Sequence, residues 1–169
     1  MSNAMGMEVQ LPYPMQIGSG TFDLRPGLTW LGQAGDWSWG AQGNAVMRMG
    51  TNNRDWSLGN QLQGTAWWAR VLGRRLAAGV RLVATRTGDI DGMDVAPSVN
   101  PAIVPTARTD LRAGTVVEGG LSLNLYIPRA RAFRVAAEVL LPLMRDLDGP
   151  QLETDLTFVL GFRVVPISH

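Results

Sequence analysis

The sequence contains no cysteine, and its single histidine is the terminal residue His169. The absence of cysteine excludes disulfides and thiolate metal sites. The absence of an internal histidine removes the usual general base of a Ser-His-Asp triad. Glu153 and Asp155 fall on one predicted strand face, and ion pairs with Arg134 or Arg163 explain them more simply than acid–base chemistry. We therefore expect no enzymatic activity and no cofactor.

Metal ligands are also scarce. Residues 89–94 (DIDGMD) are spaced like the start of a calcium loop, but the twelfth position is Asn100, where a bidentate glutamate is needed. Met1, Met5, Met7 and Met15 could supply soft copper ligands, but methionine is also an ordinary apolar residue. We expect no metal site.

The chain also lacks a long apolar run, although 46% of its 169 residues are hydrophobic. A membrane-spanning helix needs about 20 consecutive apolar residues, so the sequence excludes a helical membrane protein. A membrane-spanning strand is not excluded, because only every second residue must face lipid.

No block of like charge is present, and the net charge is +1. The chain therefore lacks the basic patch expected of a nucleic-acid-binding protein. Its first residues, MSNAMGMEVQ, have neither a basic region nor an apolar stretch, so they are not a signal peptide. A full-length outer-membrane form would need one.

Seven stretches alternate apolar and polar residues with a period of two, which predicts β-strands. No stretch long enough for a stable helix shows the 3.6-residue period of an amphipathic helix. They are residues 22–33, 37–49, 61–72, 76–87, 112–127, 133–143 and 152–165. Residues 1–20 are expected to be irregular or to supply one extra strand, although Pro12 and Pro14 are poor ladder residues. We expect a single all-β domain over 1–169, an antiparallel up-and-down barrel of about 7–8 strands or half of a larger one.

The charges of these strands fall on the face opposite the apolar residues. In the third strand the alternation is blurred, and we place Trp67, Ala69 and Val71 outward with Trp68 and Arg70 inward. A basic residue facing mid-membrane lipid costs roughly 2–4 kcal/mol, so a lipid-facing barrel should segregate charge in this way. A soluble barrel would give the same pattern with the faces exchanged. The residues predicted to line a polar lumen are Asp23, Arg25, Arg48, Arg70, Arg81, Glu118, Arg134, Glu138, Asp155 and Arg163.

The connections between strands alternate in length. Those after the first, third and fifth strands are short, and those after the second, fourth and sixth are long. Outer-membrane barrels have short periplasmic turns and long extracellular loops.

Trp30, Trp37 and Trp39 cluster around the first short turn. Tryptophan is enriched at membrane interfaces, so these residues predict an aromatic belt; core packing in a soluble barrel is the alternative. Trp56 lies in the polar loop 51–60 and supports no prediction.

Three motifs resemble an outer-membrane transporter family linked to the meta-cleavage pathway of phenol degradation or to copper-resistance genes. They are LPYPMQIGSGTFD at 11–23 followed by Pro26-Gly27, WSWGAQ at 37–42, and the tail from Glu138 to Leu152. The resemblance covers nearly the whole chain but only the C-terminal half of the family. It implies part of a bacterial outer-membrane barrel and supplies no catalytic residues.

The leading hypothesis is thus an outer-membrane channel or transporter component for small solutes, with the lipid bilayer as its main partner. Its lumen is either open or plugged by mutually paired charges. The alternative is a non-conducting or soluble barrel that binds a hydrophobic ligand or acts as a scaffold. Because single-chain bacterial barrels have even strand numbers, we expect closure by a further N-terminal strand or by self-association.

Overall fold

The computed structural model describes residues 18–93, 108–127 and 133–164, and the described part of the chain is all β, with no helix. No helix in these residues could therefore cross a membrane. The strands are β1 (Phe22–Leu24), β2 (Gly27–Ala34), β3 (Trp37–Met49), β4 (Trp56–Ser57), β5 (Gln61–Val71), β6 (Leu76–Thr87), β7 (Asp91–Gly92), β8 (Gly114–Ile127), β9 (Phe133–Leu147) and β10 (Thr157–Val164).

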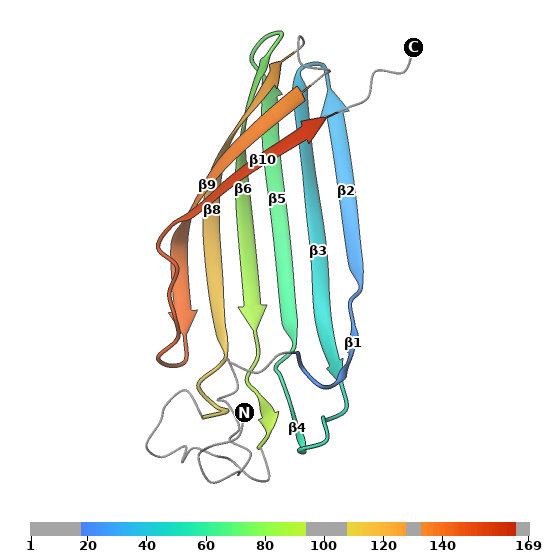
Figure 1. Cartoon of the computed structure of the whole chain (residues 1–169), viewed down its shortest axis with the longest axis vertical. Coiled ribbons are helices and arrows are strands. Elements are labelled where there is room, and N and C mark those ends of the chain that lie inside the picture. The colour runs from blue at the N-terminus through green and yellow to red at the C-terminus, as the bar shows by residue number, and fades with distance from the viewer. Residues whose placement is uncertain (1–17, 94–107, 128–132, 165–169) are drawn as a thin grey trace, which may run out of the picture.

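The main sheet is an antiparallel meander in the order β1-β3-β5-β6-β8-β9-β10, with β2 also paired to β3 (Figure 1). β1 and β2 keep the same register against β3, so they form one strand that is interrupted at Arg25 and Pro26. Proline has no N–H to donate, but its carbonyl accepts a bond from the Ala45 N–H at 3.0 Å. The predicted all-β, antiparallel arrangement of strands is confirmed.

The two ends of the sheet differ. At the "turn end", short turns at residues 35–36 and 72–75 join β2 to β3 and β5 to β6. At the "loop end", the two-residue strands β4 and β7 pair with each other as a separate small sheet. Trp56 of β4 is only 1% exposed and packs with Ile90 and Leu58. The polar loop that supported no prediction therefore contains the most deeply buried large side chain described.

The loop end is also tied together by hydrogen bonds. The Asn52 carboxamide oxygen accepts from the Arg54 N–H, and the Asn52 N–H donates to the Trp56 carbonyl at 3.0 Å. Asp89 Oδ1 accepts from the N–H groups of Arg112 and Ala113 at 3.0 and 2.8 Å. Segments that are distant in sequence are thereby joined into a "loop-end module", which comprises residues 51–60, 88–93 and 108–113.

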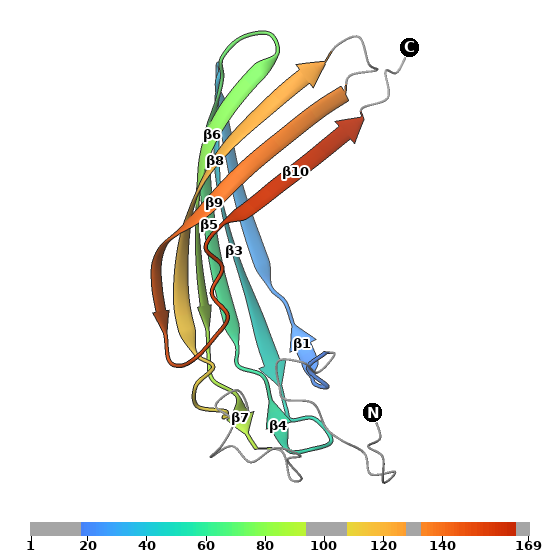
Figure 2. The same ribbon diagram turned by 60° about the vertical axis from the view of Figure 1, so that its left-hand side comes forward.

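Cross-strand register gives the sheet two chemically distinct faces. The "apolar face" carries rows such as Trp39, Trp68, Val80, Leu121, Val139 and Phe158. The "polar face" carries rows such as Gln33, Ser38, Ala69, Gly79, Ser122 and Glu138. The sheet is a single curved layer (Figure 2), and residues of β3 and β10 line the same hollow over the polar face. The polar face is therefore the concave one.

Most predicted strands and faces agree with the structure, and three details do not. The third strand's faces were assigned wrongly: Trp67 pairs with Arg81 on the polar face, whereas Trp68 and Arg70 lie on the apolar face. β9 extends to Leu147, because a register shift near Glu118 lets it continue past Pro142. β10 begins only at Thr157, so Glu153 and Asp155 precede the strand.

The sheet is not closed. Within the described residues, β1 and β2 form one edge and β10 forms the other, and no pairing joins them. Residues 1–20, which the sequence predicts to be irregular or to supply an extra strand, lie outside the described residues except for their last three positions.

Candidate functional site

The polar face is the candidate site, and its centre is an ion pair between Arg81 of β6 and Glu138 of β9. Arg81 Nη2 donates to Glu138 Oε2 across the intervening strand β8. Gly120 of β8 lies between them, and a Cβ there would come within 3.2 Å of a Glu138 carboxylate oxygen. The absence of a side chain at Gly120 thus lets the two charges meet. The Glu138 side chain is only 17% exposed.

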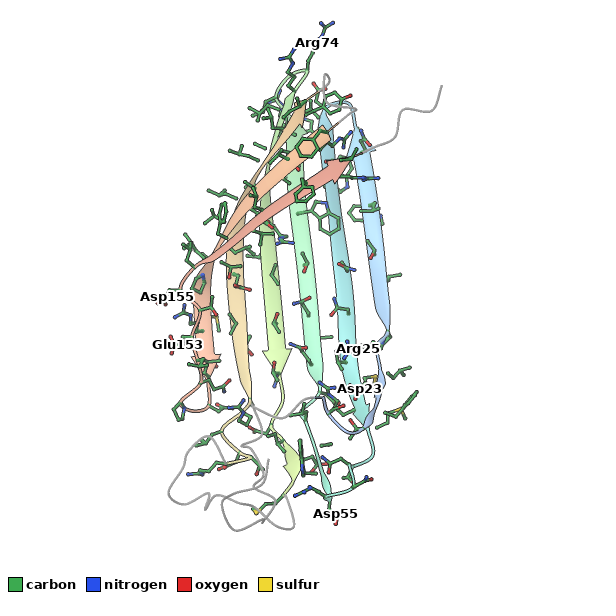
Figure 3. The ribbon with its side chains drawn as sticks, in the orientation of Figure 1. Asp23, Arg25, Asp55, Arg74, Glu153 and Asp155 are labelled. Atoms are coloured by element: carbon green, nitrogen blue, oxygen red, sulfur yellow. The ribbon has the colours of Figure 1, made fainter. Side chains whose placement is uncertain are left out.

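A second charge cluster lies at the loop-end margin of this face, where Asp23 of β1 pairs with Arg48 of β3. Both side chains are about 15% exposed, and the hydroxyls of Ser19 and Thr21 also donate to Asp23. Arg25 lies in the break between β1 and β2, 3.7 Å from Asp23, with its side chain largely exposed (Figure 3). Asp23, Arg25 and Arg48 therefore lie together at this margin.

Uncharged polar side chains lie between the two clusters. Asn44 Nδ2 donates to Gln63 Oε1 at 3.4 Å, and Gln63 Nε2 donates to Thr85 Oγ1 at 3.2 Å. The three residues are neighbours on β3, β5 and β6. Sequence reasoning missed this ladder, although the alternating polar residues Gln42 and Asn44 in β3 and Gln61, Gln63 and Thr65 in β5 were the available signal.

The concave side contains a hollow of about 530 Å³ above the centre of the polar face. Its lining includes Gln42 and Thr65 at one side, Arg81 and Glu138 at the centre, and Asn124 beyond them. Trp67 also lines it, and its indole lies across Gly40, where a Cβ would come within 2.3 Å of the ring. Such a surface can hydrogen-bond and orient small polar molecules.

The turn end of the polar face carries unpaired cations. Arg134 of β9 and Arg163 of β10 are directly opposite in register, and no ion pair with either is present among the described residues. The Arg134 guanidinium lies 5.7 Å from the centre of the Tyr126 ring. Glu118 shares this face nearer its centre, opposite Pro142.

Asp155 was predicted to lie on a strand face, and this prediction is wrong. Asp155 and Glu153 belong to the segment before β10, and both accept from the guanidinium of Arg145 in β9, at 3.0 and 2.6 Å (Figure 3). Gln151 of the same segment donates to the Ala113 carbonyl at 2.9 Å. These bonds hold the segment against the loop end of the sheet, and the Asp155 side chain is 92% exposed.

Arg70 is not on the polar face. It lies on the apolar face opposite Trp37, with its guanidinium 4.8 Å from the centre of that ring. The Trp37 and Trp68 rings meet edge-on at 5.5 Å. Trp30, Trp37 and Trp39 share the apolar face near the turn end, as predicted, and Trp68 joins them. The sequence could not assign Trp68 because two adjacent tryptophans hide the alternation.

The described residues contain no group of three or more His, Cys, Asp or Glu side chains that could hold a metal ion. Searches of protein-family models, curated proteins and solved structures returned no match to this chain.

Proposed function

We propose that this chain forms part of the wall of a bacterial outer-membrane β-barrel that passes small polar solutes. One observation carries the proposal: the polar face is concave and holds the ion pairs Arg81–Glu138 and Asp23–Arg48, whereas the opposite face is largely apolar and exposed. Leu28, Leu121 and Phe162 of the apolar face are 79%, 69% and 78% exposed. Lipid is the environment in which such side chains are favourable.

The distribution of buried residues argues against the soluble alternative. A soluble barrel would turn its apolar residues inward. Only four apolar residues are buried in the described chain: Trp56 and Ile90 in the loop-end module, and Val83 and Leu140 on the polar face. The apolar face itself contributes none, although it holds most of the large hydrophobic side chains of the strands.

Strand lengths support the same proposal. A membrane-spanning strand that is tilted by about 45° needs roughly 9–11 residues. β3, β5, β6, β8 and β9 have 13, 11, 12, 14 and 15 residues. The aromatic residues near the turn end would then lie at one interface, as in other membrane barrels. The family resemblance of the sequence motifs points to the same environment.

Closure of the barrel requires something beyond the described strands. In the meander, β2 and β10 both run from the loop end to the turn end, so direct pairing between them would be parallel. A copy of the chain with the same membrane orientation would present the same mismatch. Antiparallel closure therefore needs an odd number of additional strands between these edges. We propose that residues preceding β1 supply them, and the mass of the folded protein in detergent tests this against self-association.

Adjacent residues of β5 test which face meets lipid. Ala66 lies on the apolar face and Thr65 on the polar face. We expect Ala66→Arg to cost roughly 2–4 kcal/mol of stability in phospholipid vesicles, whereas Thr65→Arg is tolerated. Urea titration of the refolded variants measures this. The proposal fails if the two arginines cost the same, or if the wild-type protein is monodisperse without detergent.

The ion pairs favour a second candidate, a non-conducting barrel plugged by its own charges. Arg81–Glu138 and Asp23–Arg48 neutralise four of the residues expected to line the lumen. Planar-bilayer recording separates the candidates, because a plugged scaffold gives no conductance. In an open channel, Glu138→Gln should raise anion selectivity by removing the partner of Arg81. Glu153→Gln, which removes an exposed carboxylate outside the strands, should leave selectivity unchanged.

A further inference from the structure

The apolar face contains a groove that the channel hypothesis does not use. Its volume is about 820 Å³, within the range of small-molecule sites. Trp37, Trp68 and Arg70 lie at one side, and Leu123 and Val139 at the other. Ala78 and Ala137 are small, half-buried lining residues, so the groove lies where the face lacks bulky side chains.

Arg70 sets the chemistry of this groove. It shares a cross-strand row with Trp37, Ala78, Leu123 and Ala137, so it is the one cation in an otherwise apolar row of the described strands. Stacking on Trp37 is the contact that fixes its guanidinium. Arginine carries five N–H donors in the plane of that group, and stacking leaves them free to bind an anion. The side chain is exposed, near the level where β5 ends at Val71.

The net charge of this end of the sheet selects the occupant. Among the described residues, the turn end carries Arg70, Arg74, Arg75, Arg134 and Arg163 but only one carboxylate, Asp36, and Figure 3 places Arg74 at its tip. A second copy in the same orientation would bring a surface that is basic at the same level. An anionic amphiphile fits both the apolar groove and the cation.

We propose that this groove binds one anionic phospholipid, with an acyl chain over Ala78 and Ala137 and the headgroup phosphate on Arg70. The inference rests on the proposed membrane location of the apolar face. Trp37 and Trp68 would flank the lipid at the interface, and Trp37 would hold the guanidinium in place. Bulk lipid covers the rest of the face without selection for headgroup.

Native mass spectrometry of the full chain in detergent tests the site with phosphatidylglycerol and phosphatidylcholine of matched acyl chains. We expect the wild-type protein to retain phosphatidylglycerol preferentially. Arg70→Gln should lower that preference about fivefold, since one basic residue near a membrane surface contributes about that factor. The charge-matched control is Arg163→Gln, at the same end but on the polar face, and it should keep the preference.

A second variant tests the apolar part. Ala137→Leu fills the groove and should reduce retention of both lipids while Arg70 is intact. Millimolar inorganic phosphate should not displace the lipid, because the acyl chain contributes to binding. Equal losses in the two arginine variants, displacement by phosphate, or a groove-bound second copy seen as a dimer would overturn the inference. A wild-type protein that needs no detergent would instead refute the membrane location, whichever lipid preference it shows.

Discussion

Trp56 and Trp68 lie in opposite environments of the same molecule. Trp56 is 1% exposed within the loop-end module, packed with Ile90, whereas Trp68 is 55% exposed on the apolar face. The module is built as soluble proteins are, around a buried apolar side chain. The sheet has its polar side chains inside its curve and its apolar side chains outside. The chain thus buries apolar side chains in the loop-end module and exposes them on the apolar face of the sheet. Under the proposed membrane location, the boundary between these two regions is where water replaces lipid.

Removing each indole in turn is the most direct test of the difference between the two regions. Trp56→Ala should destabilise the loop-end module by about 3–5 kcal/mol, because it leaves a cavity in the module's small apolar cluster. Trp68→Ala removes a side chain that is not enclosed by protein and should cost about 1 kcal/mol or less. Hydrogen exchange of the amides in β4 and β7 measures the first effect, and urea titration in detergent the second. Equal losses of stability in the two variants would mean that Trp56 and Trp68 do not differ in how far protein packing encloses them.

A smaller effect is expected from backbone packing within the module. A Cβ on Gly59 would come within 1.9 Å of the Gly88 carbonyl oxygen, whereas a Cβ on Gly88 has no neighbour closer than 3.6 Å. Gly59→Ala should therefore cost about 1–3 kcal/mol, as overpacking does. Gly88→Ala is the matched control and should change stability by less than about 0.5 kcal/mol. Exchange rates of the Asn52 and Trp56 amides report both, and a Gly88 variant as unstable as the Gly59 variant would contradict the packing.

The strands were predictable because their signal is local. The alternation in residues 37–49 and 76–87 gave β3 and β6 with their bounds, and it placed Arg81 and Glu138 on one face. Alternation alone does not predict whether that face lies inside or outside the curve of the sheet, because soluble and membrane barrels have the same period of two. Curvature supplies this information, and curvature comes from the pairing of many strands.

The failures were all set by non-local contacts. Trp67 and Trp68 are adjacent aromatic residues, and only the glycine opposite Trp67, Gly40, selects which indole lies on the polar face. Trp56 is buried through contact with Ile90, which follows two intervening strands. The segment with Asp155 reads as a strand by alternation, but Arg145 binds it outside the sheet.

The smallest expected effect comes from the like-charged pair at the turn end. Arg134 and Arg163 are direct cross-strand neighbours, an arrangement that destabilises a sheet by a few tenths to about 1 kcal/mol. Arg163→Thr should therefore raise the urea midpoint slightly, and the gain should shrink in high salt because screening weakens the repulsion. Arg81→Thr is the opposite case. It leaves the carboxylate of Glu138 without its ion-pair partner and should lower the urea midpoint. If Arg163→Thr instead lowers the urea midpoint, repulsion between the two arginines does not destabilise the folded protein and the expected gain is wrong.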